Sequence, residues 1–96
     1  MRRLGLLLAL LACSAGAKEG EPCGGIRNLV CDAGLVCERP ANQCEVRDLS
    51  GTCVPRPEMC TADFSPVCDC AGKPHSNDCE RLKAGAQKAY DGECRQ

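Results

Sequence analysis

The sequence predicts a small disulfide-rich α+β fold, with a short helix against a small antiparallel sheet and an N-terminal cysteine-rich segment of loops and strands. Two observations predict it. The 96-residue chain contains eleven cysteines, far more than a cytosolic enzyme uses. Its only aromatic residues are Phe64 and Tyr90, so large aromatic side chains cannot supply the core. Disulfides at about 2–4 kcal/mol each would supply the missing stability.

The first 17 residues have the pattern of a secretory signal. Two arginines follow Met1, an apolar run extends over residues 4–12, and Ala15 and Ala17 form an A-x-A cleavage pattern. The apolar run is too short to span a bilayer. Removing residues 1–17 leaves 79 residues, ten cysteines, and ten basic against thirteen acidic residues, for a net charge of −3. An even ten cysteines behind a secretion signal predicts up to five disulfides in an oxidising compartment.

Cys13 opens an alternative for this leader. Residues 9–13, Ala-Leu-Leu-Ala-Cys, fit a bacterial lipobox, in which residues 1–12 are removed and the cysteine becomes the acylated first residue. Ser14 would then suit an outer-membrane lipoprotein, held at the membrane by its fatty chains. Both alternatives leave ten cysteines for disulfides, so the cysteine count does not choose between plain secretion and a lipid anchor.

The remaining composition argues against several classes of function. No basic cluster lies outside the leader, which argues against nucleic acid as a partner. We expect contact with a membrane only through the possible lipid anchor. No cysteine pair has C-x-x-C spacing and His75 is the only histidine, so neither a metal site nor a cofactor is expected. The acidic residues are scattered singly, as on a solvated surface, and no catalytic motif occurs. We therefore expect a monomeric protein that is not an enzyme.

The chain divides into a segment of residues 18–54 and a second segment of residues 55–96. Residues 18–22 are polar and predict a mobile lead-in, and residues 23–53 show turn signals but no helical period. Brief strands are expected at residues 29–30, 35–37 and 52–54. Pro55 and Pro57 form a stiff connector between the segments.

The second segment favours one short helix against a small hairpin. Residues 60–66 are expected to be extended, and good helix formers occupy residues 79–84. Asn77 or Asp78 can cap the helix start, and Gly85 fits the left-handed residue that ends it. Residues 86–90 can return as a strand before a turn that leads into the last cysteine.

The spacing of the last cysteines is more specific. Cys60-x7-Cys68-x10-Cys79-x14-Cys94, with Pro-Val before Cys68 and Asn77 two residues before Cys79, resembles a Kazal-type serine protease inhibitor domain of the secreted bacterial kind. The similarity covers residues 53–94. The first segment, with Cys-Gly-Gly at residues 23–25 and Gly-Thr-Cys at residues 51–53, resembles part of the N-terminal module of insulin-like-growth-factor-binding proteins.

The chain departs from the Kazal pattern at four places. Asp69 replaces a glycine, Ala71 replaces an aspartate, and Pro74-His75 replaces Thr-Tyr. His75 is therefore expected to be a packing residue in the place of the tyrosine rather than a ligand. Leu82 stands where the family has a further cysteine, so the usual first bridge of the family cannot form.

The two resemblances imply a disulfide pattern. The Kazal pattern implies Cys60–Cys79 and Cys68–Cys94. The growth-factor-binding pattern suggests Cys23–Cys37 and Cys31–Cys53, which would leave Cys44–Cys70 to connect the segments. A rival pattern pairs Cys53 with Cys70 and Cys31 with Cys44.

The Kazal resemblance also implies a function and its residues. It implies a secreted serine protease inhibitor whose reactive loop comprises Thr61, Ala62, Asp63 and Phe64, with Ala62 as the primary specificity residue and Asn77 bracing the loop. The alanine methyl group suits the shallow pockets of elastase-like or subtilisin-like proteases. The alternative is a non-inhibitory extracellular module that binds another protein.

Overall fold

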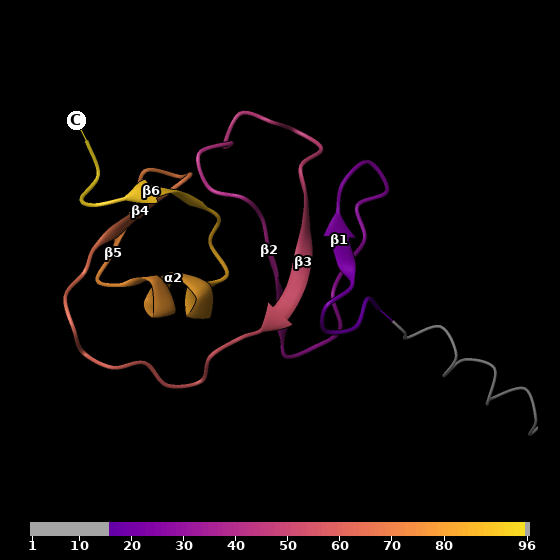
Figure 1. Ribbon diagram of the computed structural model, residues 1–96, viewed down its shortest axis with the longest axis horizontal. Coiled ribbons are helices and arrows are strands. Elements are labelled where there is room, and N and C mark those ends of the chain that lie inside the picture. The colour runs from indigo at the N-terminus through magenta and orange to yellow at the C-terminus, as the bar shows by residue number, and fades with distance from the viewer. Residues whose placement is uncertain (1–15, 96) are drawn as a thin grey trace, which may run out of the picture.

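The computed structural model describes residues 16–95, which form two three-stranded antiparallel sheets and one helix connected by disulfides. One sheet belongs to the first half of the chain and the other to the second half, and the two lie side by side (Figure 1). The helix lies beside the second sheet. The protein is thus a small, compact, disulfide-rich domain, as the sequence predicts. Cys13 and nearly all of the expected leader lie outside the described residues.

The N-terminal sheet has the order β1-β3-β2. Its strands are β1 (Pro22–Gly24), β2 (Leu35–Glu38) and the longer central strand β3 (Ser50–Pro55). Two of the three expected strands coincide with β2 and β3. The strand expected at residues 29–30 is wrong: Leu29 forms only an isolated bridge to Gly24, because this stretch turns back on β1.

The C-terminal sheet has the order β5-β4-β6. Its strands are β4 (Val67–Asp69), β5 (Pro74–His75) and β6 (Lys88–Asp91). β4 is the central strand, and all three of its residues are buried. Because β5 and β6 pair with it on opposite sides, the sheet has one strand more than the expected hairpin. β6 begins two residues later than expected, since residues 86 and 87 are needed to leave the helix.

Helix α2 (Asp78–Ala84) begins and ends where the sequence provides caps. Asn77 is extended, and its side-chain oxygen accepts a hydrogen bond from the backbone N–H of Glu80 at 2.9 Å. Asn77 rather than Asp78 is therefore the N-cap. Gly85 ends the helix with φ of 74°, a left-handed conformation that glycine adopts without steric cost.

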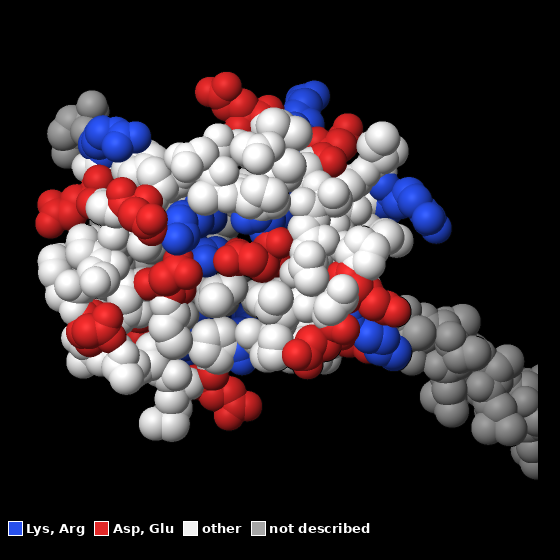
Figure 2. Space-filling view, viewed as in Figure 1, with Lys and Arg blue, Asp and Glu red and all other residues white. Residues whose placement is uncertain are grey.

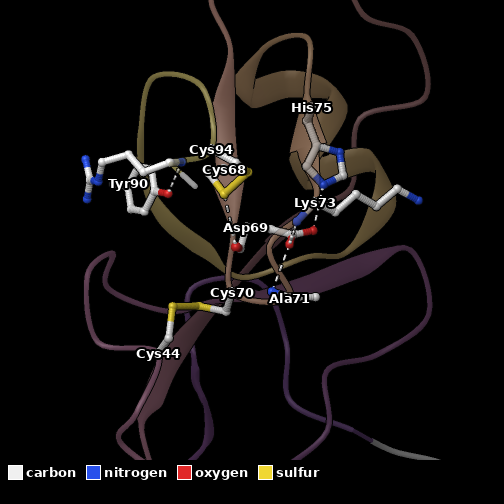
Figure 3. The surroundings of a disulfide bond; sticks show 10 residues. Cys44, Cys68, Asp69, Cys70, Ala71, Lys73, His75, Tyr90 and Cys94 are labelled. Atoms are coloured by element: carbon white, nitrogen blue, oxygen red, sulfur yellow. Dashed lines mark hydrogen bonds and ion pairs between the residues drawn. A yellow bond between two sulfur atoms is a disulfide. The ribbon is translucent and has the colours of Figure 1, made fainter.

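Five disulfides connect the described cysteines, and they follow the pattern suggested by the two resemblances rather than its rival. The pairs are Cys23–Cys37, Cys31–Cys53, Cys44–Cys70, Cys60–Cys79 and Cys68–Cys94. Two lie in the N-terminal half and two in the C-terminal half. Cys44–Cys70 connects the halves, which gives them a second covalent link besides the backbone (Figure 3).

The core is small. Three of the six buried apolar residues in the described part are disulfide cysteines, and the others are Val36, Val67 and Ala89. The largest fully buried side chain is that of Arg81 in α2, which is 0% exposed. A domain of this size therefore buries too little apolar surface to be stable without its bridges.

Arg81 binds groups from both halves. Its Nη1 and Nη2 donate to the two carboxylate oxygens of Glu38 on β2 at 2.8 and 2.9 Å. Its Nε donates to Asp78 at 2.9 Å, and Nη1 also donates to the carbonyl of Ala86 at 2.9 Å. Glu38 first, and then Asp78, raise the pKa of the guanidinium against its desolvation, so the buried charge is retained.

Two further hydrogen bonds connect the halves. The backbone N–H of Asn42 donates to the carbonyl of Ala89 at 2.8 Å, and the backbone N–H of Arg56 donates to the carbonyl of Gly34 at 2.9 Å. Figure 2 shows that the charged side chains on the visible face are mixed in sign and form no large patch of one charge.

Two expectations need correction. The lead-in of residues 18–22 is bound rather than mobile: the N–H of Gly20 donates to Cys53, and the N–H of Cys53 donates to Glu21. The acidic residues are not all on a solvated surface, since Asp69 is only 5% exposed and Glu38 is paired with Arg81. The partners of the lead-in and of Glu38 lie far along the chain, where local composition carries no signal. The partners of Asp69 are only two to six residues away, and two of them are backbone N–H groups.

Within residues 16–95, no helix has the length and apolar character needed to cross a bilayer. The five disulfides suggest an extracytoplasmic protein, because reducing compartments keep cysteines as thiols.

The buried ion pair makes a testable prediction. Arg81→Ala should lower the free energy of unfolding by about 2–5 kcal/mol, because it removes a fully buried side chain and leaves Glu38, Asp78 and the carbonyl of Ala86 without their donor. Arg56→Ala, at an exposed position, removes one side-chain hydrogen bond, to the carbonyl of Lys83, and should cost about 1 kcal/mol or less. Denaturant unfolding with the disulfides intact measures both, and equal losses for the two variants would contradict the assignment.

Candidate functional site

The candidate site is the segment between β3 and β4, which runs around the outside of the C-terminal half past α2 (Figure 1). Residues 61–65 are all exposed and form no regular secondary structure. Two disulfides hold the ends of the segment. Cys60 is bonded to Cys79 in the first turn of α2, and Cys68 in β4 is bonded to Cys94 near the C-terminus.

Asn77 connects this loop to the helix. Its side-chain amide donates to the carbonyl of Thr61 at 3.1 Å and to the carbonyl of Asp63 at 2.8 Å. The same side chain caps α2 through its oxygen, so both amide hydrogens and the carbonyl are engaged. Asn77 is 4% exposed. A buried, fully engaged amide therefore fixes the backbone on both sides of Ala62.

Two further contacts shape the loop. The hydroxyl of Thr61 donates to the carboxylate of Asp63 across Ala62. The N–H of Ser65 donates to the carbonyl of Ser76 at 2.8 Å, which attaches the far end of the loop next to β5. Ala62 thus lies at the exposed centre of a segment whose neighbours on both sides are bonded.

The residues at the expected site are therefore brought together. Thr61, Ala62, Asp63 and Phe64 form one continuous exposed stretch, and Phe64 is 71% exposed. Asn77 lies beneath the stretch and contacts it directly. This arrangement can present an ordered, exposed peptide segment to a partner with little loss of backbone freedom on binding.

Asp69 and His75 form a second cluster, beneath the β4–β5 turn. Asp69 accepts hydrogen bonds from the backbone N–H groups of Ala71 at 2.8 Å and Lys73 at 2.9 Å, and its other oxygen contacts Nε2 of His75 at 2.8 Å (Figure 3). The imidazole is 10% exposed. His75 therefore packs beside β4, and Asp69 supplies the polar partner that a buried imidazole needs.

The pKa of Asp69 is lowered despite its burial. Desolvation raises the pKa, but hydrogen bonds from His75 and from the N–H groups of Lys73 and Ala71 stabilise the carboxylate more strongly. This cluster was not foreseen from the sequence, although both residues stand out as departures from the Kazal pattern. Their joint appearance at positions 69 and 75 is the signal that could have suggested the pair.

One group of side chains has metal-ligand spacing in the described part of the chain. The sulfur atoms of Cys23, Cys31 and Cys53 lie within 4.8 Å of one another. All three are bonded in disulfides, and a disulfide sulfur is not the thiolate that zinc requires. The group is two adjacent disulfides rather than a metal site.

Comparison of the chain with protein-family models, with curated proteins and with solved structures gives no match.

Asn77 provides a direct test of the loop geometry. Asn77→Asp keeps the oxygen that caps α2 but replaces the two donors with a carboxylate oxygen facing the carbonyls of Thr61 and Asp63. We expect unchanged helix content by circular dichroism and about tenfold faster cleavage between residues 61 and 64 by a broad-specificity protease, since tenfold corresponds to about 1.4 kcal/mol. Asn77→Ala should lose both the loop bonds and the cap. Wild-type resistance in Asn77→Asp would refute the bracing role.

The Asp69 cluster predicts acid sensitivity. Because the pKa of Asp69 in the folded protein lies below its usual value of 3.8, the carboxylate stabilises the fold above about pH 4. That contribution is lost as the pH falls through the lowered pKa. Asp69→Asn should be less stable than wild type at pH 7, by about 1–3 kcal/mol, and the difference should shrink below pH 4. An NMR titration that gives Asp69 a pKa of 3.8 or higher would contradict this.

Proposed function

We propose that the protein is a secreted serine protease inhibitor that acts by presenting residues 61–64 as a substrate-like loop. The observation that carries the proposal is the bracing of Ala62. One buried amide binds the carbonyls before and after it, and the Cys60–Cys79 bridge attaches the loop to the same helix.

The physical argument concerns the cost of ordering. A protease binds its substrate as an extended strand, and a flexible peptide loses conformational entropy when it is held in that shape. A loop that is already fixed avoids most of this loss and binds more tightly. If the bond after Ala62 is cleaved, the two new ends stay attached by Cys60–Cys79 and by Asn77, so they remain close enough to be rejoined.

The side chain of Ala62 suggests the class of protease. It is small and exposed, and it would occupy the primary specificity pocket of the enzyme. A methyl group cannot reach the acidic base of a trypsin-like pocket and underfills a deep apolar one. It matches the shallow pockets of elastase-like or subtilisin-like proteases, because a methyl group fills such a pocket and so contacts most of its apolar wall.

A second candidate function is a non-inhibitory extracellular module that binds another protein. It is favoured by the N-terminal half, where Ile26 is 85% exposed and Val30 is 71% exposed. These residues lie in the N-terminal sheet's first loop, away from residues 61–64 in the sequence. In this alternative the C-terminal half would be a structural support.

Substitution of Ala62 separates the two functions. Wild type should inhibit elastase and subtilisin but not trypsin, and Ala62→Arg should lose the first two and gain trypsin, because the guanidinium matches an acidic pocket. Ala33→Arg, the same change at an exposed position of the N-terminal half, should behave as wild type. Titration of each enzyme with each variant gives the inhibition constants.

If neither wild type nor Ala62→Arg inhibits any of the three enzymes while non-reducing peptide maps show all five bridges, residues 61–64 are not a reactive loop of this kind. The binding-module function would then be preferred.

A further inference from the structure

Residues 16 and 17, at the start of the described chain, are hydrogen-bonded to residues 30 and 32 of the N-terminal half. The N–H of Ala17 donates to the carbonyl of Val30 at 2.8 Å, and the N–H of Asp32 donates to the carbonyl of Ala17 at 2.8 Å. Ala17 therefore forms a parallel bridge with Cys31, one of the disulfide cysteines. Both Gly16 and Ala17 are partly buried.

Gly16 fits its position closely. Its N–H donates to the carboxylate of Asp32 at 2.6 Å. A Cβ atom at this residue would lie 2.8 Å from the carbonyl oxygen of Val30 and 2.9 Å from Oδ1 of Asp32, closer than real Cβ atoms approach. The close packing of the backbone, rather than a turn, therefore requires glycine here.

Asp32 is the acceptor on which this contact depends. One carboxylate oxygen accepts from Gly16 and the other forms an ion pair with Nζ of Lys18 at 3.0 Å. The hydrogen bond from Lys18 and then that from Gly16 lower the pKa of Asp32. The carboxylate thus holds residues on both sides of Ala17.

A cut after Ala17, at the A-x-A pattern, would remove these contacts from the mature protein. Three hydrogen bonds would be lost, those from Gly16 to Asp32, from Ala17 to Val30 and from Asp32 to Ala17. The carbonyl of Val30 and the N–H of Asp32 would lose their partners. We infer that the leader is instead removed by hydrolysis of a peptide bond upstream of Gly16, so that Gly16 and Ala17 belong to the mature protein.

Two upstream bonds have suitable neighbours. Hydrolysis after Ala15 would follow the small residues Cys13 and Ala15, at three and one positions before the cut. Water would add across the bond to leave a carboxylate on Ala15 and an ammonium on Gly16, within reach of the Asp32 carboxylate that its nitrogen already contacts at 2.6 Å. Hydrolysis before Cys13 would also keep residues 16 and 17.

The first experiment measures the mature N-terminus. The full-length precursor is expressed in a Gram-negative bacterial host, and the processed protein is purified and examined by intact mass and N-terminal sequencing. A mature chain that begins at Gly16, or at Cys13 with or without acyl chains, agrees with the inference. A mature chain that begins at Lys18 overturns it, and neither result depends on protease inhibition.

A second experiment tests the structural role of Ala17 separately. Ala17→Pro removes the N–H that donates to Val30, and a proline immediately before a cleavage site blocks ordinary leader removal. If the cut lies upstream, Ala17→Pro should be processed normally, and the mature protein should melt about 4–8 °C lower, the shift for one lost backbone hydrogen bond in a domain of this size. Glu19→Ala, at an exposed neighbouring position, should change neither. Accumulation of unprocessed Ala17→Pro precursor, or an unchanged melting temperature, would contradict the inference.

Discussion

The buried guanidinium of Arg81 is the interaction on which the arrangement of the molecule depends. It lies in α2, is fully buried, and forms a bidentate pair with Glu38 of β2 in the other half of the chain. A buried charge is costly unless it is fully paired, so the helix has one favourable position relative to the N-terminal sheet. Since Asn77 caps that helix and also binds the loop, the position of α2 determines the position of the loop.

The disulfides and the polar contacts have different roles in this account. Five bridges limit the freedom of the unfolded chain and so offset the shortage of apolar core. They do not by themselves define the shape of residues 61–65, of which none is a cysteine. That shape comes from short polar contacts. Asn77 donates to the carbonyls of Thr61 and Asp63, on either side of Ala62, and Ser76 accepts from the N–H of Ser65 at the far end of the loop. The combination lets an exposed segment keep one conformation without regular secondary structure.

The sequence predicts what depends on local pattern or on cysteine spacing. The helix, its caps and the strands β2 and β3 follow from residue type, and the pairing of the cysteines follows the two family resemblances. The Glu38–Arg81 pair could not be predicted, because its partners are 43 residues apart and each looks like an ordinary surface charge. The burial of Asp69 escaped prediction for a different reason: two of its three partners are backbone N–H groups, which every sequence contains.

The central claim is that the fold holds the Ala62–Asp63 bond and its two ends in one geometry, and the equilibrium of that bond measures this most directly. Intact protein and protein already cleaved at this bond would each be incubated with a catalytic amount of subtilisin, and the two forms separated after reduction. The account predicts that both incubations reach the same mixture with substantial intact chain, because the held ends are rejoined. Complete hydrolysis from the intact side, with no religation from the cleaved side, would contradict it.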